Sequence, residues 1–281
     1  MTLGVWSRAF RRLAPDRLAD VAAELESLGY TTIWIPGETG GDVLDTVGAA
    51  LAATSRARVA TGVLNIWMHE PADVAAAHDA LLARFPGRAV LGLGVSHGPA
   101  VERYTAPLRA MTTFLDGLDA ASDVAKPADR VLGALGPRML ELARSRTGGA
   151  HPYLVTPAHT ARARELLGPD AWLAPEQKVL PETDPDRARE LIRGRLAYLF
   201  ALPNYRNNLL RQGFTDADLE GGGSDRLVDA LVLWGGPDRI AAGLAAHRAA
   251  GADEVALHVL TPDPAEAPLE QWRRLAALGT T

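Results

Sequence analysis

Short apolar runs alternate with longer amphipathic segments along the chain, and this alternation constrains the fold more than any single residue. The apolar runs are rich in β-branched and aromatic residues, as strands are. Parallel strands joined by crossover helices produce this order of elements, so the sequence predicts a parallel α/β fold. The candidate strands are Leu3–Trp6, Thr31–Ile35, Val59–Leu64, Ala89–Val95, Arg130–Leu135, His151–Val155, Ala171–Leu180 and Glu254–Leu260.

The segments between these runs have helical spacing. In Pro15–Gly29, for example, Leu18, Val21, Ala22 and Leu25 fall on one face, with a proline at the start and a glycine at the end. From Asp184 to about Leu233 the alternation gives way to a helix-rich excursion. Eight strands alternating with helices over 281 residues favour a single (β/α)8 TIM-barrel domain spanning residues 1–281, with a helical insertion over about 184–233 before the last strand. An open doubly wound sheet is the alternative.

Composition excludes several functions. The net charge is −5, from 29 basic and 34 acidic residues without a basic block, which argues against a nucleic-acid partner. The chain has no cysteine, so disulfides and thiolate metal sites are excluded, and we expect a cytoplasmic location. No run is long enough for a membrane span, and no signal-peptide pattern is present. The histidines show no HxxxH or HExxH spacing, so no metal site is expected.

The stretch Arg58–Gly98 indicates where a site would form. Two strand-like runs flank one helix, and both end in polar, aromatic or small residues. The carboxyl ends of neighbouring parallel strands meet at one edge of a sheet, where α/β folds usually build their sites. The residues at these ends are Asn65, Trp67 and His69 after the first run, and Ser96, His97 and Gly98 after the second.

Several segments together resemble a known family. They are LGYTTIWIPGE, DVLDTVGAALAATSRARVATGVLNIW, GRAVLGLGVSHG and GALGPRMLELA, with AGADEVALHVL agreeing near the C-terminus. The chain resembles the luciferase-like monooxygenase superfamily, and most of all its deazaflavin (coenzyme F420)-dependent oxidoreductase branch. The resemblance covers roughly the first two-thirds of the chain. It implies a bacterial luciferase-like barrel with an insertion before the last strand, a deazaflavin or flavin at the C-terminal edge, and a homodimer.

The resemblance also implies where the phosphate of the cofactor binds. In GALGPRM a strand enters a helix through a glycine-rich turn, where backbone N–H groups and the helix dipole favour an anion. The residues nearest the phosphate would be Gly133, Ala134, Leu135 and Gly136. Pro137 lacks an N–H, and an ordinary tight turn is the alternative.

The remaining cofactor residues follow from the same resemblance. Gly62-Val63 matches the position of a non-proline cis peptide bulge behind the ring, and an unremarkable strand glycine is the alternative. Asn65 would hydrogen-bond the pyrimidine edge of the ring or a substrate, and Val95 and Ser96 would border it. Trp6 would either pack on the cofactor or close the bottom of the barrel.

His97 is the first candidate for proton transfer. The superfamily often has an acidic or polar residue in this loop, and a histidine titrates near neutral pH. The alternative is a loop histidine that hydrogen-bonds a backbone carbonyl. Glu38 is the second candidate, with an exposed loop carboxylate as its alternative. His258 lies within the last strand, where a satisfied core histidine is expected.

These observations predict an oxidoreductase that transfers a hydride between coenzyme F420 and a small organic substrate. An FMN-dependent monooxygenase on the same fold is one alternative. A barrel that binds a cofactor or ligand without turnover is the other.

Overall fold

The computed structural model of the chain describes residues 2–37, 42–98 and 104–279. Its strands form one parallel sheet in the order β7-β6-β5-β4-β3-β2-β1-β10-β8-β9. The strands are β1 (Thr2–Trp6), β2 (Thr32–Gly37), β3 (Arg58–Asn65), β4 (Ala89–Gly94), β5 (Arg130–Leu132), β6 (Gly149–Ala150), β7 (Trp172–Leu173), β8 (Glu176–Leu180), β9 (Val232–Trp234) and β10 (Glu254–Val259).

The sheet curls into a barrel, because β7 and β8 belong to one extended segment, 172–180. On one side of this segment the Glu176 amide donates to the carbonyl of Pro152 (2.8 Å), next to β6. On the other side the Ala256 amide of β10 donates to the carbonyl of Pro175 (2.9 Å). Counted as one strand, the segment joins the two sides of an eight-stranded barrel. The predicted (β/α)8 architecture is therefore confirmed.

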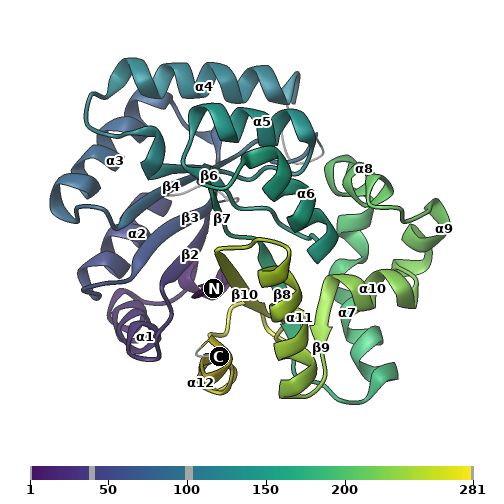
Figure 1. Cartoon of the computed structure of the whole chain (residues 1–281). Coiled ribbons are helices and arrows are strands. Elements are labelled where there is room, and N and C mark those ends of the chain that lie inside the picture. The colour runs from purple at the N-terminus through teal and green to yellow at the C-terminus, as the bar shows by residue number, and fades with distance from the viewer. Residues whose placement is uncertain (1, 38–41, 99–103, 280–281) are drawn as a thin grey trace.

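Helices surround the strands (Figure 1), and eight of them have a proline in the first turn, where its missing N–H leaves no intrahelical bond unmade. Within the described ranges every helix is too short or too polar to span a lipid bilayer. The α-helices are α1 (Pro15–Ser27), α2 (Val43–Ala52), α3 (Pro71–Arg84), α4 (Pro107–Ala121), α5 (Pro137–Arg146), α6 (Pro157–Leu167), α7 (Pro185–Phe200), α8 (Pro203–Arg211), α9 (Asp216–Leu219), α10 (Asp225–Leu231), α11 (Pro237–Ala249) and α12 (Leu269–Ala276).

Two strand predictions need correction, and a further strand was not predicted. The predicted strand His151–Val155 is displaced, because β6 occupies Gly149–Ala150 and the chain turns at Leu154, whose φ is 58°. A Cβ on Gly149 would lie 1.9 Å from the Trp172 carbonyl oxygen, so the close pairing of β6 with β7 needs a glycine at this position. A search for apolar runs does not detect a strand that depends on glycine. The predicted strand Ala171–Leu180 divides at Pro175. Strand β9 falls at the end of the predicted insertion and was missed.

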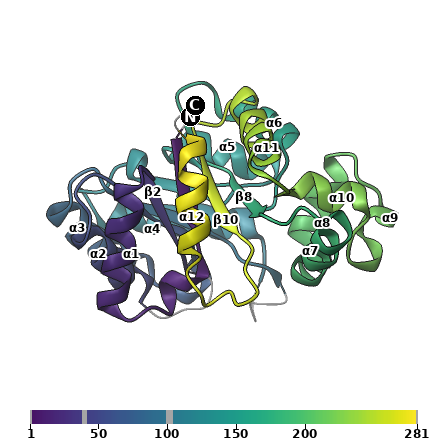
Figure 2. The same cartoon turned by 90° about the horizontal axis from the view of Figure 1, so that it is seen from below.

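The excursion has a hydrophobic core of its own. Helices α7, α8 and α10 contribute Ile192, Leu196, Leu209 and Leu227 to a cluster that is separate from the main barrel core. Figure 2 shows α7, α8, α9 and α10 gathered on one side of the barrel. The insertion can therefore bring side chains to the barrel mouth without disturbing the packing of the barrel.

The N-terminal end of the barrel is filled. Trp34 stacks on His151 with ring centroids 3.8 Å apart, and its indole N–H donates to a carboxylate oxygen of Glu254 (2.9 Å). The same carboxylate accepts the hydroxyl of Thr32 (2.7 Å). Because this end is packed, the free space of the barrel lies at the C-terminal ends of the strands.

Candidate functional site

A cavity of about 420 Å³ opens at the C-terminal ends of β1, β3, β4 and β5. It contains nine of the residues that the sequence predicted for the site and adds others from α7, α8 and the segment after β6. Its lining is Trp6, Arg8, Gly62, Val63, Asn65, Gly94, Val95, Ser96, His97, Gly133, Leu135, His151, Tyr153, Tyr198, Leu199, Leu202, Asn204 and Tyr205.

The other three predicted residues are placed elsewhere. Ala134 is fully buried in the hydrophobic core. Gly136 is the N-cap of α5 and does not reach the cavity. Glu38 lies outside the described residues, so its role stays a prediction.

The floor of the cavity is a bulge in β3. The peptide bond between Gly62 and Val63 is cis, as predicted, and the pairing of β3 with β4 shifts register between Ala60 and Leu64. The indole N–H of Trp6 donates to the carbonyl of Gly62 (2.6 Å). Trp6 is therefore part of the cavity wall and does not close the bottom of the barrel.

Glycines make room for the Val63 side chain. A Cβ on Gly94 would lie 2.4 Å from Cγ2 of Val63, and one on Gly133 would lie 3.4 Å from the same atom. A larger side chain at Gly94 would therefore collide with the bulge. The result is a cavity floor of small residues, on which a flat ring can lie.

His97 enters the cavity from the loop after β4. Among the described residues its Nδ1 atom has no hydrogen-bond partner, and its ring lies 4.6 Å from that of Tyr205. Burial lowers the pKa of His97, so the ring is neutral at pH 7. Nδ1 therefore does not form, with any described residue, the bond to a backbone carbonyl that the alternative interpretation of His97 expects.

The His97 loop is held by helix α8. Asn204, in the first turn of α8, donates to the carbonyl of Ser96 (2.9 Å) and to the hydroxyl of Tyr104 (3.1 Å). Ser96 has a φ of 56°, a left-handed conformation that carries the chain sharply away from β4. The insertion thus fixes the loop that carries the proton-transfer candidate.

The ends of β3 and β4 are tied together by Trp67. Its indole N–H donates to the carbonyl of Val95 (2.6 Å), and its backbone N–H donates to the side chain of Asn65 (3.2 Å). Neither Trp67 nor His69 lines the cavity. Asn65 does line the cavity, and because its side-chain oxygen already accepts the N–H of Trp67, its NH2 group is the part left to bond a ligand there.

Residues 1–116 match the family model described as luciferase-like monooxygenase. Solved structures superpose over nearly the whole chain. An F420-dependent secondary alcohol dehydrogenase, in complex with an F420-acetone adduct, has a TM-score of 0.74 at 14% identity, with 99% of each chain covered. The chain has a luciferase-like barrel fold.

Two further structures share this fold. The coenzyme F420-dependent tetrahydromethanopterin reductase of Methanopyrus kandleri has a TM-score of 0.73 at 17% identity, over 99% of this chain and 97% of that one. The oxygenating constituent of 3,6-diketocamphane monooxygenase from Pseudomonas putida, in complex with FMN, has a TM-score of 0.70 at 15% identity, over 99% and 96%. At these identities the likeness shows the fold, and the family match supports the resemblance over residues 1–116.

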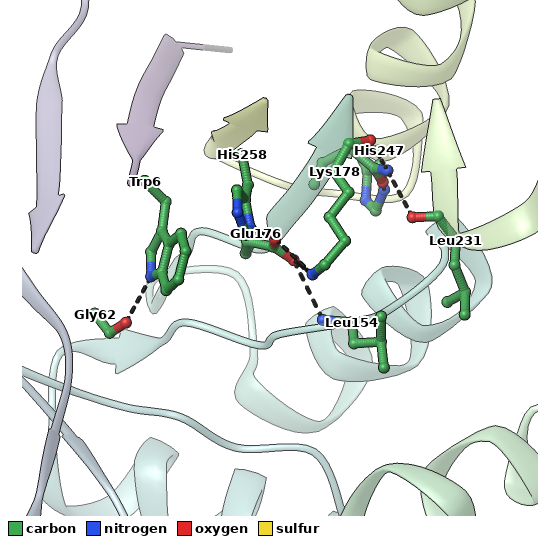
Figure 3. A network of polar contacts seen from close by, with 9 residues as sticks. Trp6, Gly62, Leu154, Glu176, Lys178, Leu231, His247 and His258 are labelled. Carbon is green, nitrogen blue, oxygen red and sulfur yellow. Dashed lines mark hydrogen bonds and ion pairs between the residues drawn. The ribbon is translucent and has the colours of Figure 1, made fainter. Parts of the chain in front are cut away.

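A buried charged network lies beside the cavity of this luciferase-like barrel (Figure 3). The Lys178 ammonium is 2.7 and 3.0 Å from the two carboxylate oxygens of Glu176, and Nδ1 of His258 is 2.7 Å from one of them. Burial alone would raise the pKa of Glu176, but the charge of Lys178 and the hydrogen bond from His258 lower it to about 2. Desolvation lowers the pKa of His258 to about 4. His258 is therefore bonded, as expected, but to a carboxylate at the edge of the barrel mouth.

A second cavity, of about 440 Å³, lies at the first turn of α5. Arg162 of α6 and Arg211 of α8 both line it, and burial together with the charge of Arg162 lowers the pKa of Arg211. Among the described residues, Nδ2 of the buried Asn208 has no hydrogen-bond partner. Leu135 lines both this cavity and the one at the barrel mouth, so the two are adjacent.

Sequence reasoning missed the residues that the insertion contributes. Tyr205, Asn204 and Arg211 all come from α8, and no local pattern indicates which face of that helix meets the barrel. Glu176 and Lys178 did carry a signal, because charged residues inside a fully buried strand rarely occur without a partner. Within the described ranges no three potential ligands gather into a metal site.

Proposed function

We propose that this chain is an oxidoreductase of the luciferase-like family that binds coenzyme F420 and transfers a hydride between it and a small organic substrate. The observation that carries the proposal is the cavity floor at Gly62-Val63, cleared by glycines and adjoining a cavity at the first turn of α5 that two arginines line. Two of the solved structures with this fold carry coenzyme F420 in their names.

The mouth cavity suits a flat heteroaromatic ring. Gly62, Gly94 and Gly133 leave its floor open, while Trp6 and Tyr153 supply aromatic walls. Asn65 would bond the pyrimidine edge of the ring, and the walls would exclude water from its reactive face.

The second cavity suits the anionic part of the cofactor. Arg162 and Arg211 provide two positive charges against the one carboxylate of Glu165, which also lines the cavity, and the Asn208 amide provides a buried donor. The N-terminus of α5 adds its dipole, although Pro137 at the first position provides no N–H. The phosphate would therefore bind beyond Leu135, next to Arg211, and not within the glycine turn alone.

When bound, the deazaflavin supplies a ring that accepts or donates a hydride. The protein positions the substrate, excludes water and manages one proton. His97 is the group placed for that proton, because its ring is neutral at pH 7 and its Nδ1 atom has no described partner. Glu38 remains the second candidate.

An FMN-dependent monooxygenase is the second candidate function. One structural neighbour is solved in complex with FMN, and FMN also joins a flat ring to a phosphate. A barrel that binds a cofactor without turnover is the third.

Parallel anaerobic titrations of the apoprotein with coenzyme F420 and FMN test the proposal. We expect F420 to bind at least about tenfold more tightly, a difference of about 1.4 kcal/mol. Tighter FMN binding, together with oxygen consumption when the bound FMN is reduced, would overturn the F420 assignment. Tight F420 binding without turnover of any carbonyl or alcohol substrate would favour the binding barrel.

A further inference from the structure

We propose that a smaller cavity beside the barrel mouth binds an anionic group of the substrate, so that the substrate is a small organic acid or a phosphate ester. This inference rests on the proposed function, because it assigns the larger cavity to the cofactor. The smaller cavity has a volume of about 160 Å³. It is lined on the barrel side by Ser7, Arg8, Lys178 and His258, and on the insertion side by Arg195, Tyr198 and Leu199.

The small cavity adjoins the cofactor cavity. Arg8, Tyr153, Tyr198 and Leu199 line both of them. A substrate whose reacting carbon faces the cofactor can therefore extend its other end into the small cavity. That end of the substrate would lie between a wall from the barrel and a wall from α7.

The described lining of the small cavity is cationic. Arg8, Lys178 and Arg195 line it, and none of its described lining residues is an aspartate or a glutamate. Glu176 lies behind Lys178 and supplies one negative charge to this group. The charge of Arg8 also helps to lower the pKa of His258, so its field reaches the same wall. The described lining therefore presents positive charge to the small cavity, part of which Glu176 offsets.

Arg195 is the clearest candidate to contact the anion. Its guanidinium donates to the carbonyls of Thr261 (2.8 Å) and Pro262, and within the described ranges it forms no ion pair. Those bonds orient the guanidinium at the cavity wall while leaving its charge without a described carboxylate. A guanidinium held in this way is suited to a carboxylate or phosphate.

The Glu176 carboxylate positions Lys178, a second cation in the wall of the small cavity. A lysine that is 2% exposed loses much of its hydration, and Glu176 compensates for that loss at 2.7 Å. Nζ of Lys178 also lies 3.6 Å from the centroid of the Tyr153 ring, which both cavities share. Figure 3 shows the ion pair of Lys178 with Glu176. Because Tyr153 lines both cavities, the pair holds Lys178 beside the boundary between the cofactor cavity and the proposed anion site.

Calorimetric titration of the full-length protein with acetate and its neutral isostere acetamide tests the inference. The titrations use protein saturated with coenzyme F420 and, separately, the apoprotein carrying Arg211→Gln, so that the cavity at α5 does not contribute. We expect acetate to bind and acetamide not to. Arg195→Gln should weaken acetate binding about tenfold or more, because a charged hydrogen bond is lost. Arg195→Lys should restore most of it.

The matched control is Arg187→Gln on the same helix, since Arg187 has a 72% exposed side chain and pairs with Glu182 outside the cavity. It should bind acetate as the native protein does. Methyl phosphate titrated in parallel distinguishes a phosphate substrate from a carboxylate. Equal binding of acetamide, or unchanged acetate binding in Arg195→Gln, would overturn the inference. If both Arg195 variants fail to fold, the acetate–acetamide comparison in native protein decides.

The two proposals fail separately. F420 binding without any preference for acetate would remove the anion site and leave the cofactor assignment intact. An Arg195-dependent acetate site in a protein that binds neither F420 nor FMN would leave the anion site intact and remove the cofactor assignment.

Discussion

His97 carries a buried ring nitrogen, Nδ1, that no described residue satisfies. Nε2 of His151, which lines the same cavity, shares this property. The lowered pKa of His97 keeps the ring neutral, so it can accept a proton from an alcohol, and the imidazolium formed in that step is the species that would return a proton in the reverse direction. Tyr205 packs against this ring and limits where it can turn. The proposed proton transfer therefore depends on one side chain with a defined position.

Replacing His97 with glutamine should lower kcat by about 10²–10⁴-fold, the usual contribution of a general acid or base. The dissociation constant for coenzyme F420 should change by less than about threefold, because the substitution leaves the cavity floor at Gly62-Val63 and the cavity at α5 unchanged. Steady-state kinetics and a binding titration check both parts. Full activity in His97→Gln would show that another group transfers the proton, and Glu38 would then be the first to test.

Gly94 tests whether the floor must stay open. Gly94→Ala places a Cβ 2.4 Å from Cγ2 of Val63, so the bulge must move toward the ring site. We expect F420 affinity to fall about tenfold or more and stability to drop by about 1–3 kcal/mol. Gly236→Ala is the control, since nothing lies within 4 Å of its added Cβ. Unchanged affinity in Gly94→Ala would place the ring elsewhere.

At the scale of elements, the insertion and the barrel meet where helix α8 holds the β4 loop. Asn204 is the link, through the carbonyl of Ser96 and the hydroxyl of Tyr104. The site is thus assembled from two hydrophobic cores, the barrel core and the separate cluster of α7, α8 and α10.

Asn204→Ala should remove about 1 kcal/mol of stability and raise KM more than it lowers kcat, because the loop is loosened while His97 remains. Asn207→Ala is the matched control, an exposed asparagine on the same helix. Denaturant unfolding and steady-state kinetics measure both effects. Equal behaviour of the two variants would show that the link does not position the loop.

The sequence predicted the barrel and its first five strands because each strand coincides with an apolar run that is followed by a segment of helical spacing. It also predicted the cis bond at Gly62-Val63 through the family resemblance. It misplaced β6 and missed β9, which are two and three residues long and depend on pairing partners for their formation. The α8 contributions could not be predicted, because they depend on how the two cores pack together.

At the scale of the whole molecule, buried histidines make stability depend on pH. Desolvation lowers the pKa values of His151, His247 and His258 to about 4, against about 6.5 in an unfolded chain. Above pH 6.5 both states are neutral and the full stability is present. Between pH 6.5 and 4 the unfolded chain binds more protons than the folded one, so stability falls as the pH falls.

Urea unfolding at pH 7, 6 and 5 should therefore show a loss of several kcal/mol in all, on the order of 1.4 kcal/mol per histidine per pH unit. His247→Gln should reduce the slope by about one proton, because His247 bonds Gln177 and Thr160 within the core and lines none of the three cavities discussed above. A native protein equally stable at pH 7 and pH 5 would contradict the lowered pKa values of the buried histidines.

The homodimer and the cytoplasmic location remain predictions.

A crystal structure of the protein soaked with coenzyme F420 tests the central claim most directly. The account predicts the deazaflavin ring on the floor formed by Gly62 and Val63, with His97 at its reactive face and the phosphate beside Arg211. A ring bound away from the Gly62-Val63 bulge, or a phosphate at the opposite side of the barrel mouth, would contradict it.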